Sequence, residues 1–205
     1  MYTLVESGTI TKHFNKPKGF TLGDNQYPAD IFMKWSVAEK EAIGIYEVVF
    51  DDSNKKDEKW YINTNQSFAF ANDTVTAYYG NATPKAHADT LWTAQDETDG
   101  KGTEGELNTR GLKYNLIKDL KITVANELSK TDWYITRNTE KSTAIPSAIS
   151  NHRDAVRTIQ ASMETLITNA ANTPALETLY TYVNTADEGD PIVMARPLAE
   201  IPTLD

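Results

Sequence analysis

The second half of the chain carries an apolar periodicity that a helix satisfies and a strand does not. Leu112, Leu116, Leu120, Val124 and Leu128 recur at four-residue intervals. This spacing puts them along one face of a helix, which we expect to cover 109–129. An apolar stripe of this kind has to be buried against another element. The chain therefore needs a packing partner for this helix.

A second apolar series follows a heptad spacing. We refer to Ile149, Val156, Met163 and Ala170, which lie seven residues apart, as the heptad seam. The seam predicts a second long helix. Two arrangements bury it: an antiparallel hairpin with the first helix, which is the more economical, or an axis shared by three copies. The spacing alone is compatible with both.

The first eighty or so residues are typical of short strands, because β-branched and aromatic residues alternate there with turn residues. Ser36 and Glu39 have the spacing of a capping box, which predicts a short helix over 37–43 that ends at Gly44. We expect these strands to form a small antiparallel sheet. The expected strands are 2–5, 9–14, 20–22, 26–28, 45–50, 60–62, 68–70 and 75–79.

These patterns predict an α+β fold, with a small N-terminal antiparallel β domain and one short helix over 1–80, followed by a C-terminal α-helical hairpin or bundle over 109–183. The segment 81–108 is rich in glycine and acidic residues, which predicts a linker. A short third helix is expected to begin near Pro174. The last segment, 184–205, contains prolines and is expected to be an extended tail.

Composition disfavours several classes of function. The net charge of -9 and the pI near 4.9 disfavour a nucleic-acid partner, whose phosphates are bound by lysine and arginine. The lack of cysteine removes disulfides, thiol nucleophiles and cysteine-based zinc sites. No apolar run approaches the roughly 20 residues of a membrane span. The first residues, Met1–Leu4, lead into polar sequence and not into a secretory signal.

Catalytic and metal-binding motifs are weak throughout. His13, His87 and His152 are too far apart for local ligand spacing, and we expect His152 to pack or hydrogen-bond between helices. The pair His87 and Asp89 has no accompanying Gly-x-Ser-x-Gly nucleophile motif. We therefore expect no enzyme activity, no metal site and no cofactor.

One acidic stretch has a superficial likeness to a calcium loop. Counting back from Gly100, the ligand positions fall on Gln95, Glu97 and Asp99, and Glu106 occupies the place of the final bidentate glutamate. The glutamine in the first position weakens the pattern. A solvated acidic linker is the simpler interpretation.

Candidate interface residues come from two kinds of pattern. Aromatic side chains on strands are enriched at protein interfaces, and heptad residues face partner helices. We also expect Trp133 and Tyr134 to brace the corner between the two long helices, and Arg153 and Arg157 to pair with acids such as Asp119 or Asp132. The interface set is Trp60, Tyr61, Tyr78, Tyr79, Trp133, Tyr134, Ile149, Val156 and Met163.

Two blocks of this sequence resemble bacteriophage tail proteins. The first runs from Lys18-Gly19-Phe20 through Tyr27-Pro28 to Gly44-Ile45-Tyr46, and is similar to a segment at the start of many phage tail proteins. The second runs from Thr131-Asp132-Trp133-Tyr134 through Ile145-Pro146 to Arg153 and Val156-Arg157, and resembles the module shared by tail-fibre and tail-fibre-assembly proteins. Together the blocks cover about half of the chain.

The resemblance implies a role in the phage tail apparatus. One form is a structural virion protein of the tail, baseplate or neck, built in the host cytoplasm, that connects tail fibres and binds other tail or fibre proteins as a trimer or hexamer. The alternative is an assembly chaperone that is absent from the finished particle. A glycan hydrolase would require a carboxylate pair in a cleft.

Overall fold

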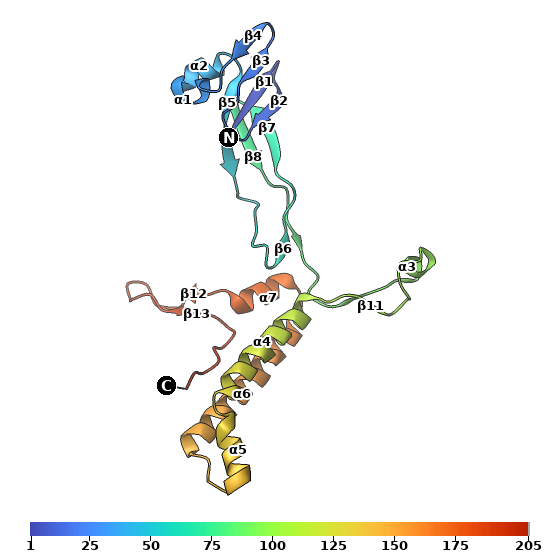
Figure 1. Cartoon of the computed structure of the whole chain (residues 1–205), viewed down its shortest axis with the longest axis vertical. Coiled ribbons are helices and arrows are strands. Elements are labelled where there is room, and N and C mark those ends of the chain that lie inside the picture. The colour runs from blue at the N-terminus through green and yellow to red at the C-terminus, as the bar shows by residue number, and fades with distance from the viewer. Residues whose placement is uncertain (205) are drawn as a thin grey trace. The chain divides into compact units, whose positions relative to one another are not determined.

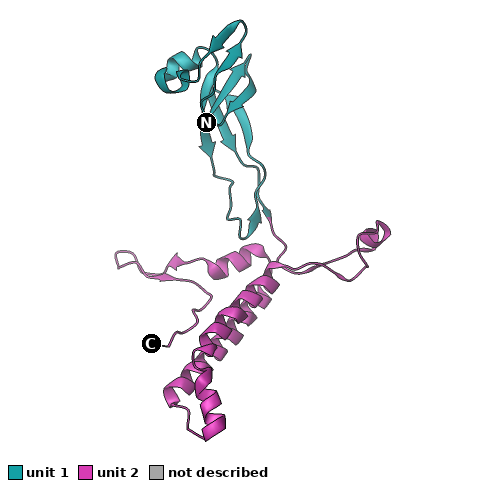
Figure 2. Ribbon diagram, in the orientation of Figure 1, with its two compact units in different colours: residues 1–83 teal, residues 84–205 magenta. Residues whose placement is uncertain are grey.

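The computed structural model describes residues 1–204 and divides into two compact units, Met1–Thr83 and the part that begins at Pro84 (Figure 2). The fold is mixed α+β, and its elements are shown in Figure 1. Among the described residues, no helix is both long and apolar enough to cross a membrane.

The first unit is built on a five-stranded sheet with the order β2-β1-β5-β8-β7. Its edge strands curl toward each other, since the rings of His13 on β2 and Phe68 on β7 lie 4.4 Å apart. Two smaller ribbons, β3 with β4 and β6 with β9, complete the strand pairing. The elements of this unit are β1 Tyr2–Glu6, β2 Thr9–Phe14, β3 Phe20–Leu22, β4 Asn25–Tyr27, α1 Ile31–Lys34, α2 Val37–Glu41, β5 Ile45–Asp51, β6 Tyr61–Ile62, β7 Ser67–Ala71, β8 Thr74–Tyr78 and β9 Thr83–Pro84.

The expectation of an antiparallel sheet is wrong at one pairing. β5 runs parallel to β8, with Val48 opposite Val75, whereas the other neighbouring strands are antiparallel. Parallel neighbours need a long connection. The charged loop after Asp51, β6 and β7 together provide it, so β8 returns to the sheet in the same direction as β5.

The capping-box prediction is confirmed at α2. Ser36 Oγ accepts a hydrogen bond from the Glu39 backbone N–H, and the Glu39 carboxylate accepts one from the Ser36 N–H. Gly44 follows with a φ of +80°, where an added Cβ would lie 2.3 Å from the Val5 carbonyl oxygen. The sequence did not reveal the preceding single-turn helix α1, whose Ile31 and Phe32 are buried in the core.

The second unit is built around two long helices that pack antiparallel. The elements of this unit are β10 Thr90–Leu91, α3 Ala94–Thr98, β11 Leu107–Thr109, α4 Leu112–Ser129, α5 Asp132–Lys141, α6 Ser147–Asn169, α7 Thr173–Tyr180, β12 Val183–Asn184 and β13 Met194–Ala195. Lys113 Nζ near the start of α4 donates to the Thr168 carbonyl near the end of α6. Leu116, Leu120 and Val124 of α4 are buried, as is the heptad seam.

Two segments of this unit differ from the sequence-based expectation. The expected linker, 81–108, contains the β10–β11 ribbon and the short helix α3, which Thr93 and Asp96 cap reciprocally. The expected corner between the two long helices contains the ten-residue helix α5, which begins directly after Thr131. An apolar period does not reveal α5 because nearly all its side chains are polar or exposed. The helix ends at Ser142, which has a φ of +53°.

The chain after α7 is extended, as expected, and it packs on its own helices. β12 pairs with β13, and the Leu198 N–H donates to the Leu179 carbonyl at 3.1 Å. The Leu198 side chain is 1% exposed. The third helix is confirmed as α7, with Asn172 as its N-cap and Pro174 in its first turn.

Candidate functional site

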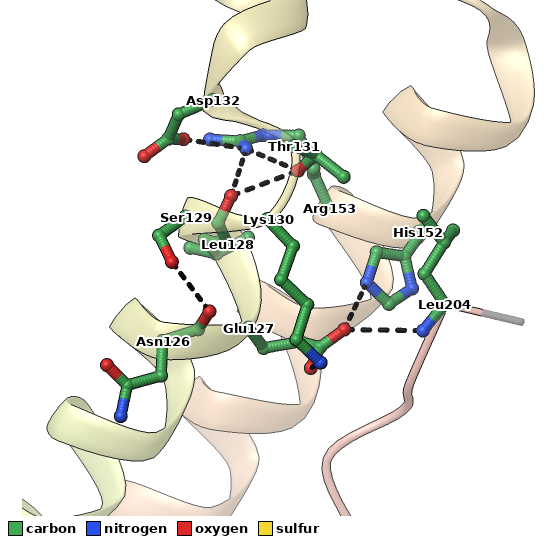
Figure 3. Close-up of polar contacts among 10 residues, drawn as sticks. All are labelled: Asn126, Glu127, Leu128, Ser129, Lys130, Thr131, Asp132, His152, Arg153 and Leu204. Carbon is green, nitrogen blue, oxygen red and sulfur yellow. Dashed lines mark hydrogen bonds and ion pairs between the residues drawn. The ribbon is translucent and has the colours of Figure 1, made fainter.

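A cluster of polar groups fixes the corner where α4, α5 and α6 meet (Figure 3). Buried Arg153 on α6 donates from Nη1 to the Leu128 carbonyl at 2.7 Å and to Thr131 Oγ1 at 2.7 Å, and it pairs with Asp132 Oδ1 at 2.9 Å. Leu128 lies in the last turn of α4, where backbone carbonyls have no partner within the helix. The Leu128 carbonyl also accepts from the Thr131 N–H at 3.1 Å, so Arg153 adds a charged donor at the end of α4 and ties this end to the start of α5.

The other half of the cluster is centred on Glu127, the buried carboxylate of α4. Its Oε1 lies 3.2 Å from His152 Nε2 on α6 and accepts a hydrogen bond from the Leu204 N–H at 3.3 Å (Figure 3). Its Oε2 accepts from Lys130 Nζ. The hydrogen bond from Lys130 is the main cause that lowers the pKa of Glu127, against the opposing effect of burial. Glu127 thus joins both long helices to the C-terminal tail.

These groups are arranged for positioning. Arg153 Nη1, both carboxylate oxygens of Glu127 and Lys130 Nζ contact neighbouring side chains or backbone groups of the same corner, whereas Arg153 Nε is buried without a hydrogen-bond partner among the described residues. Within residues 1–204, no group of three or more histidine, cysteine, aspartate or glutamate residues could hold a metal ion. Of the two acids named as partners for Arg153 and Arg157, Asp132 pairs with Arg153, and Arg157 lies 3.5 Å from Asp154.

The predicted interface aromatics of the first unit divide by burial. Trp60 and Tyr61 are only 3% and 4% exposed, with Lys59 over the Trp60 ring and Lys56 over the Tyr61 ring. Tyr78 on β8 is exposed, and Tyr79 is half-buried below Lys55. Of these four aromatic residues, Tyr78 is exposed, Tyr79 is half-buried, and Trp60 and Tyr61 are buried.

Trp133 and Tyr134 lie in the first turn of α5, with ring centroids 3.8 Å apart. Trp133 is exposed and has the Arg137 guanidinium over its ring, whereas Tyr134 is half-buried. The side chains that tie this corner together are Thr131, Asp132 and Arg153. The predicted bracing by aromatic rings is thus replaced by a polar cluster.

Ile149, Val156 and Met163 of the heptad seam are buried within a single chain. Val156 is 0% exposed, and the other two are 7% and 6% exposed. Of the two arrangements that the spacing allowed, the structure contains the packing of α6 on α4 in one chain. These side chains are consequently not an exposed interface.

Sequence reasoning missed a second surface on α4, which we call the outer face. It consists of Tyr114, Ile117, Lys118, Lys121, Ile122 and Ala125, which line a hollow of about 520 Å³. The stripe repeats with helical spacing, so the signal was present, but the longer leucine series dominated the pattern. Tyr114 and Ile122 are 43% and 51% exposed.

The acidic stretch considered as a calcium loop makes local contacts. Asp96 caps α3 by accepting from the Thr93 N–H and Oγ1, and Lys101 forms ion pairs with Asp96 and Asp99. These hydrogen bonds lower the pKa of both aspartates. Gln95 donates to Asp99, so the residue at the first loop position contacts another of the proposed ligands.

Comparison of the chain with protein-family models, curated proteins and solved structures found no match.

Proposed function

We propose that this chain is a structural protein of a bacteriophage tail, baseplate or neck, where it attaches or connects tail fibres through protein–protein contacts. In this role the β-rich first unit is a docking domain and the α4–α6 hairpin is a packed stalk. The protein acts as a symmetric oligomer, a trimer or a hexamer, in the assembled tail.

The main support for the proposal is the geometry of the second block that resembles phage tail proteins, from Thr131 to Arg157. Thr131 and Asp132 open this block and Arg153 lies near its end, and the three side chains are in direct contact in the corner cluster. The residues that resemble the tail-fibre module are therefore the ones that shape this corner. A likeness in residues with a shared structural task supports a likeness in fold more strongly than scattered identities do.

An assembly chaperone is the alternative, because the same block resembles tail-fibre-assembly proteins. The two roles differ in where the protein ends up. A virion component remains in the particle, whereas a chaperone holds the fibre in the host cytoplasm and is then released.

Quantitative mass spectrometry of purified particles and of the infected lysate separates the two. We expect this chain in particles at a fixed ratio to other tail proteins. Its absence from particles together with abundance in the lysate would establish the chaperone. Absence from both particles and infected cells would overturn the assignment to the tail apparatus.

A further inference from the structure

The outer face of α4 is covered only in part within its own unit. The Arg110 guanidinium lies over the Tyr114 ring, 4.2 Å from its centroid, and Lys121 forms an ion pair with Glu164 of α6. The outer face lies on a different side of the helix from the buried residues Leu116 and Leu120. Its apolar side chains include Tyr114 and Ile122, and both are substantially exposed. An apolar hollow rimmed by polar groups is typical of a contact surface.

The same unit also presents an apolar pair on a projecting ribbon. We call residues 90–109 the arm; it extends away from α4 and α6 in Figure 2. Leu91 on β10 lies opposite Leu107 on β11, and the two are 54% and 41% exposed.

The arm has a defined structure, so these leucines are presented in a fixed arrangement. The Trp92 N–H donates to the Glu106 carbonyl at 2.9 Å, and the Gly105 N–H donates to the Trp92 carbonyl at 3.0 Å. The Trp92 ring covers Gly102 so closely that an added Cβ there would lie 2.4 Å from the indole nitrogen. At the base, Asp89 pairs with Arg110 and accepts from the Gly111 N–H.

The two surfaces have opposite charge. The six residues of the outer face include Lys118 and Lys121 and no carboxylate, and Lys121 forms a long ion pair of 3.7 Å with Glu164 of α6. The arm has one lysine, Lys101, which already pairs with two of its acids. The carboxylates of the arm are Asp96, Glu97, Asp99, Glu104 and Glu106.

Charge also decides against the simplest self-association. If two outer faces packed on each other, Lys118 and Lys121 of one copy would meet the same lysines of the other. Like charges brought together in this way oppose association. An acidic apolar segment is the better occupant, and the arm of a second copy is one.

We propose that the arm of one copy docks on the outer face of α4 in a second copy. Leu91 and Leu107 enter the hollow, and the arm's carboxylates face Lys118 and Lys121. This contact is heterologous, since each copy uses a different surface, and it repeats into a ring or a filament. The proposal rests on the proposed function only in that it gives the oligomer a contact surface. It is tested by self-association of the purified chain, and this result does not depend on whether the chain is found in phage particles.

The contact between the arm and the outer face is small, so the association should be weak. From Tyr114 to Ala125 the outer face spans about 17 Å at the helical rise per residue. One such contact buries less than the roughly 1,600 Å² of a standard stable interface. Association should therefore depend on concentration, and it should weaken with salt because exposed charges contribute.

Sedimentation of the purified full chain over a range of concentrations tests the proposal. We expect reversible self-association of the wild type and about tenfold or more weaker association for Lys118→Glu/Lys121→Glu. The control is Lys16→Glu/Lys18→Glu, which changes the net charge equally at exposed positions of the first unit. Circular dichroism verifies that each variant keeps its helices.

A charge-reversal rescue identifies the arm as the occupant. Glu104→Lys/Glu106→Lys should weaken association on its own, and the chain carrying all four substitutions should recover it. A wild type that is monomeric at every concentration overturns the proposal. Association that is unchanged by the α4 lysine substitutions shows that the copies meet through another surface, and also overturns it. Failure of the four-substitution chain to recover shows that another segment occupies the outer face.

Discussion

The two units stabilise their interiors in different ways. In the first unit, one cluster of six buried side chains, half of them phenylalanine, joins β1, β2, β3, β5 and α1. In the second unit, α4 and α6 pack through an apolar stripe. At the corner where α4 ends, the polar residues Glu127, His152 and Arg153 lie next to this stripe (Figure 3). The helix pair therefore has two separable sources of stability, the apolar stripe and the polar corner cluster, whereas the first unit depends mainly on apolar packing.

The largest expected effect comes from a charge placed in the α4–α6 stripe. Val156→Asp buries a carboxylate at a position that is 0% exposed. An unpaired buried charge costs several kcal/mol, so we expect destabilisation of the second unit by at least about 4 kcal/mol. Hydrogen exchange followed by mass spectrometry, read separately for peptides of each unit, should show loss of protection in α4 and α6.

Ala155→Asp is the matched control, because Ala155 is the exposed neighbour in the same helix. It should leave the exchange pattern close to that of the wild type. Unchanged protection in Val156→Asp would refute the packing of the heptad seam. An equal loss of protection in peptides of the first unit would refute the independence of the two cores.

The next largest loss of stability is expected in the first unit. Phe32 is 4% exposed, and its ring lies 5.2 Å from that of Tyr2 and 5.1 Å from that of Phe14. Phe32→Ala leaves a cavity among these rings and should cost about 3 kcal/mol of unfolding free energy. Peptides of β1, β2 and β5 should exchange faster, while α4 and α6 should not change.

Met33→Ala serves as the control for Phe32→Ala. Met33 follows Phe32 in α1, yet it is 73% exposed. Its truncation should change the unfolding free energy by less than about 0.5 kcal/mol. Equal effects of the two substitutions would show that α1 is not anchored through Phe32.

In both units, the sequence predicted the elements that depend on residues close together in the chain. The Ser36–Glu39 capping box and the leucine period of α4 are local patterns, and the structure contains both elements. The parallel pairing of β5 with β8 was not predictable, because it depends on a return path through β6 and β7. The short helix α1 was missed because its four residues are too few to form a helical period.

The corner cluster was predicted only in part. An ion pair of Arg153 or Arg157 with Asp119 or Asp132 was expected, and the structure contains the pair of Arg153 with Asp132. The contact of Arg153 with the Leu128 carbonyl could not be predicted, since it requires knowing where α4 ends and how α6 passes that end. Glu127 escaped notice because a carboxylate within a helical sequence is most often solvated.

A smaller effect than in either core is expected from Arg153. Arg153→Met retains much of the length of the side chain but removes the donor to Leu128 and Thr131 and the partner of Asp132. Hydrogen bonds from a charged group contribute more than neutral ones, and we expect a loss of about 2 kcal/mol, measured by urea unfolding. The control, Arg157→Met, removes an exposed ion pair of 3.5 Å and should cost less than about 0.5 kcal/mol. Equal losses would show that the corner does not depend on Arg153.

The smallest effect is a pH dependence that distinguishes the polar corner from the apolar core. Lys130, the Leu204 N–H and His152 face Glu127, and the Lys130 hydrogen bond is the main cause that lowers the pKa of Glu127 from 4.5. A carboxyl group whose pKa is lower in the folded state stabilises the fold above its unfolded pKa, and this contribution is lost as the pH falls through the folded pKa.

Glu127→Gln should therefore be less stable than the wild type near neutral pH, and the difference should shrink as the pH falls below 4.5. Urea unfolding from about pH 3 to pH 7 measures the two curves. Lys130→Met removes the main cause of the shift, so its acid-dependent loss of stability should be smaller than that of the wild type. If the gap between wild type and Glu127→Gln stays constant with pH, Glu127 acts in the corner through its shape and its hydrogen bonds and not through its charge.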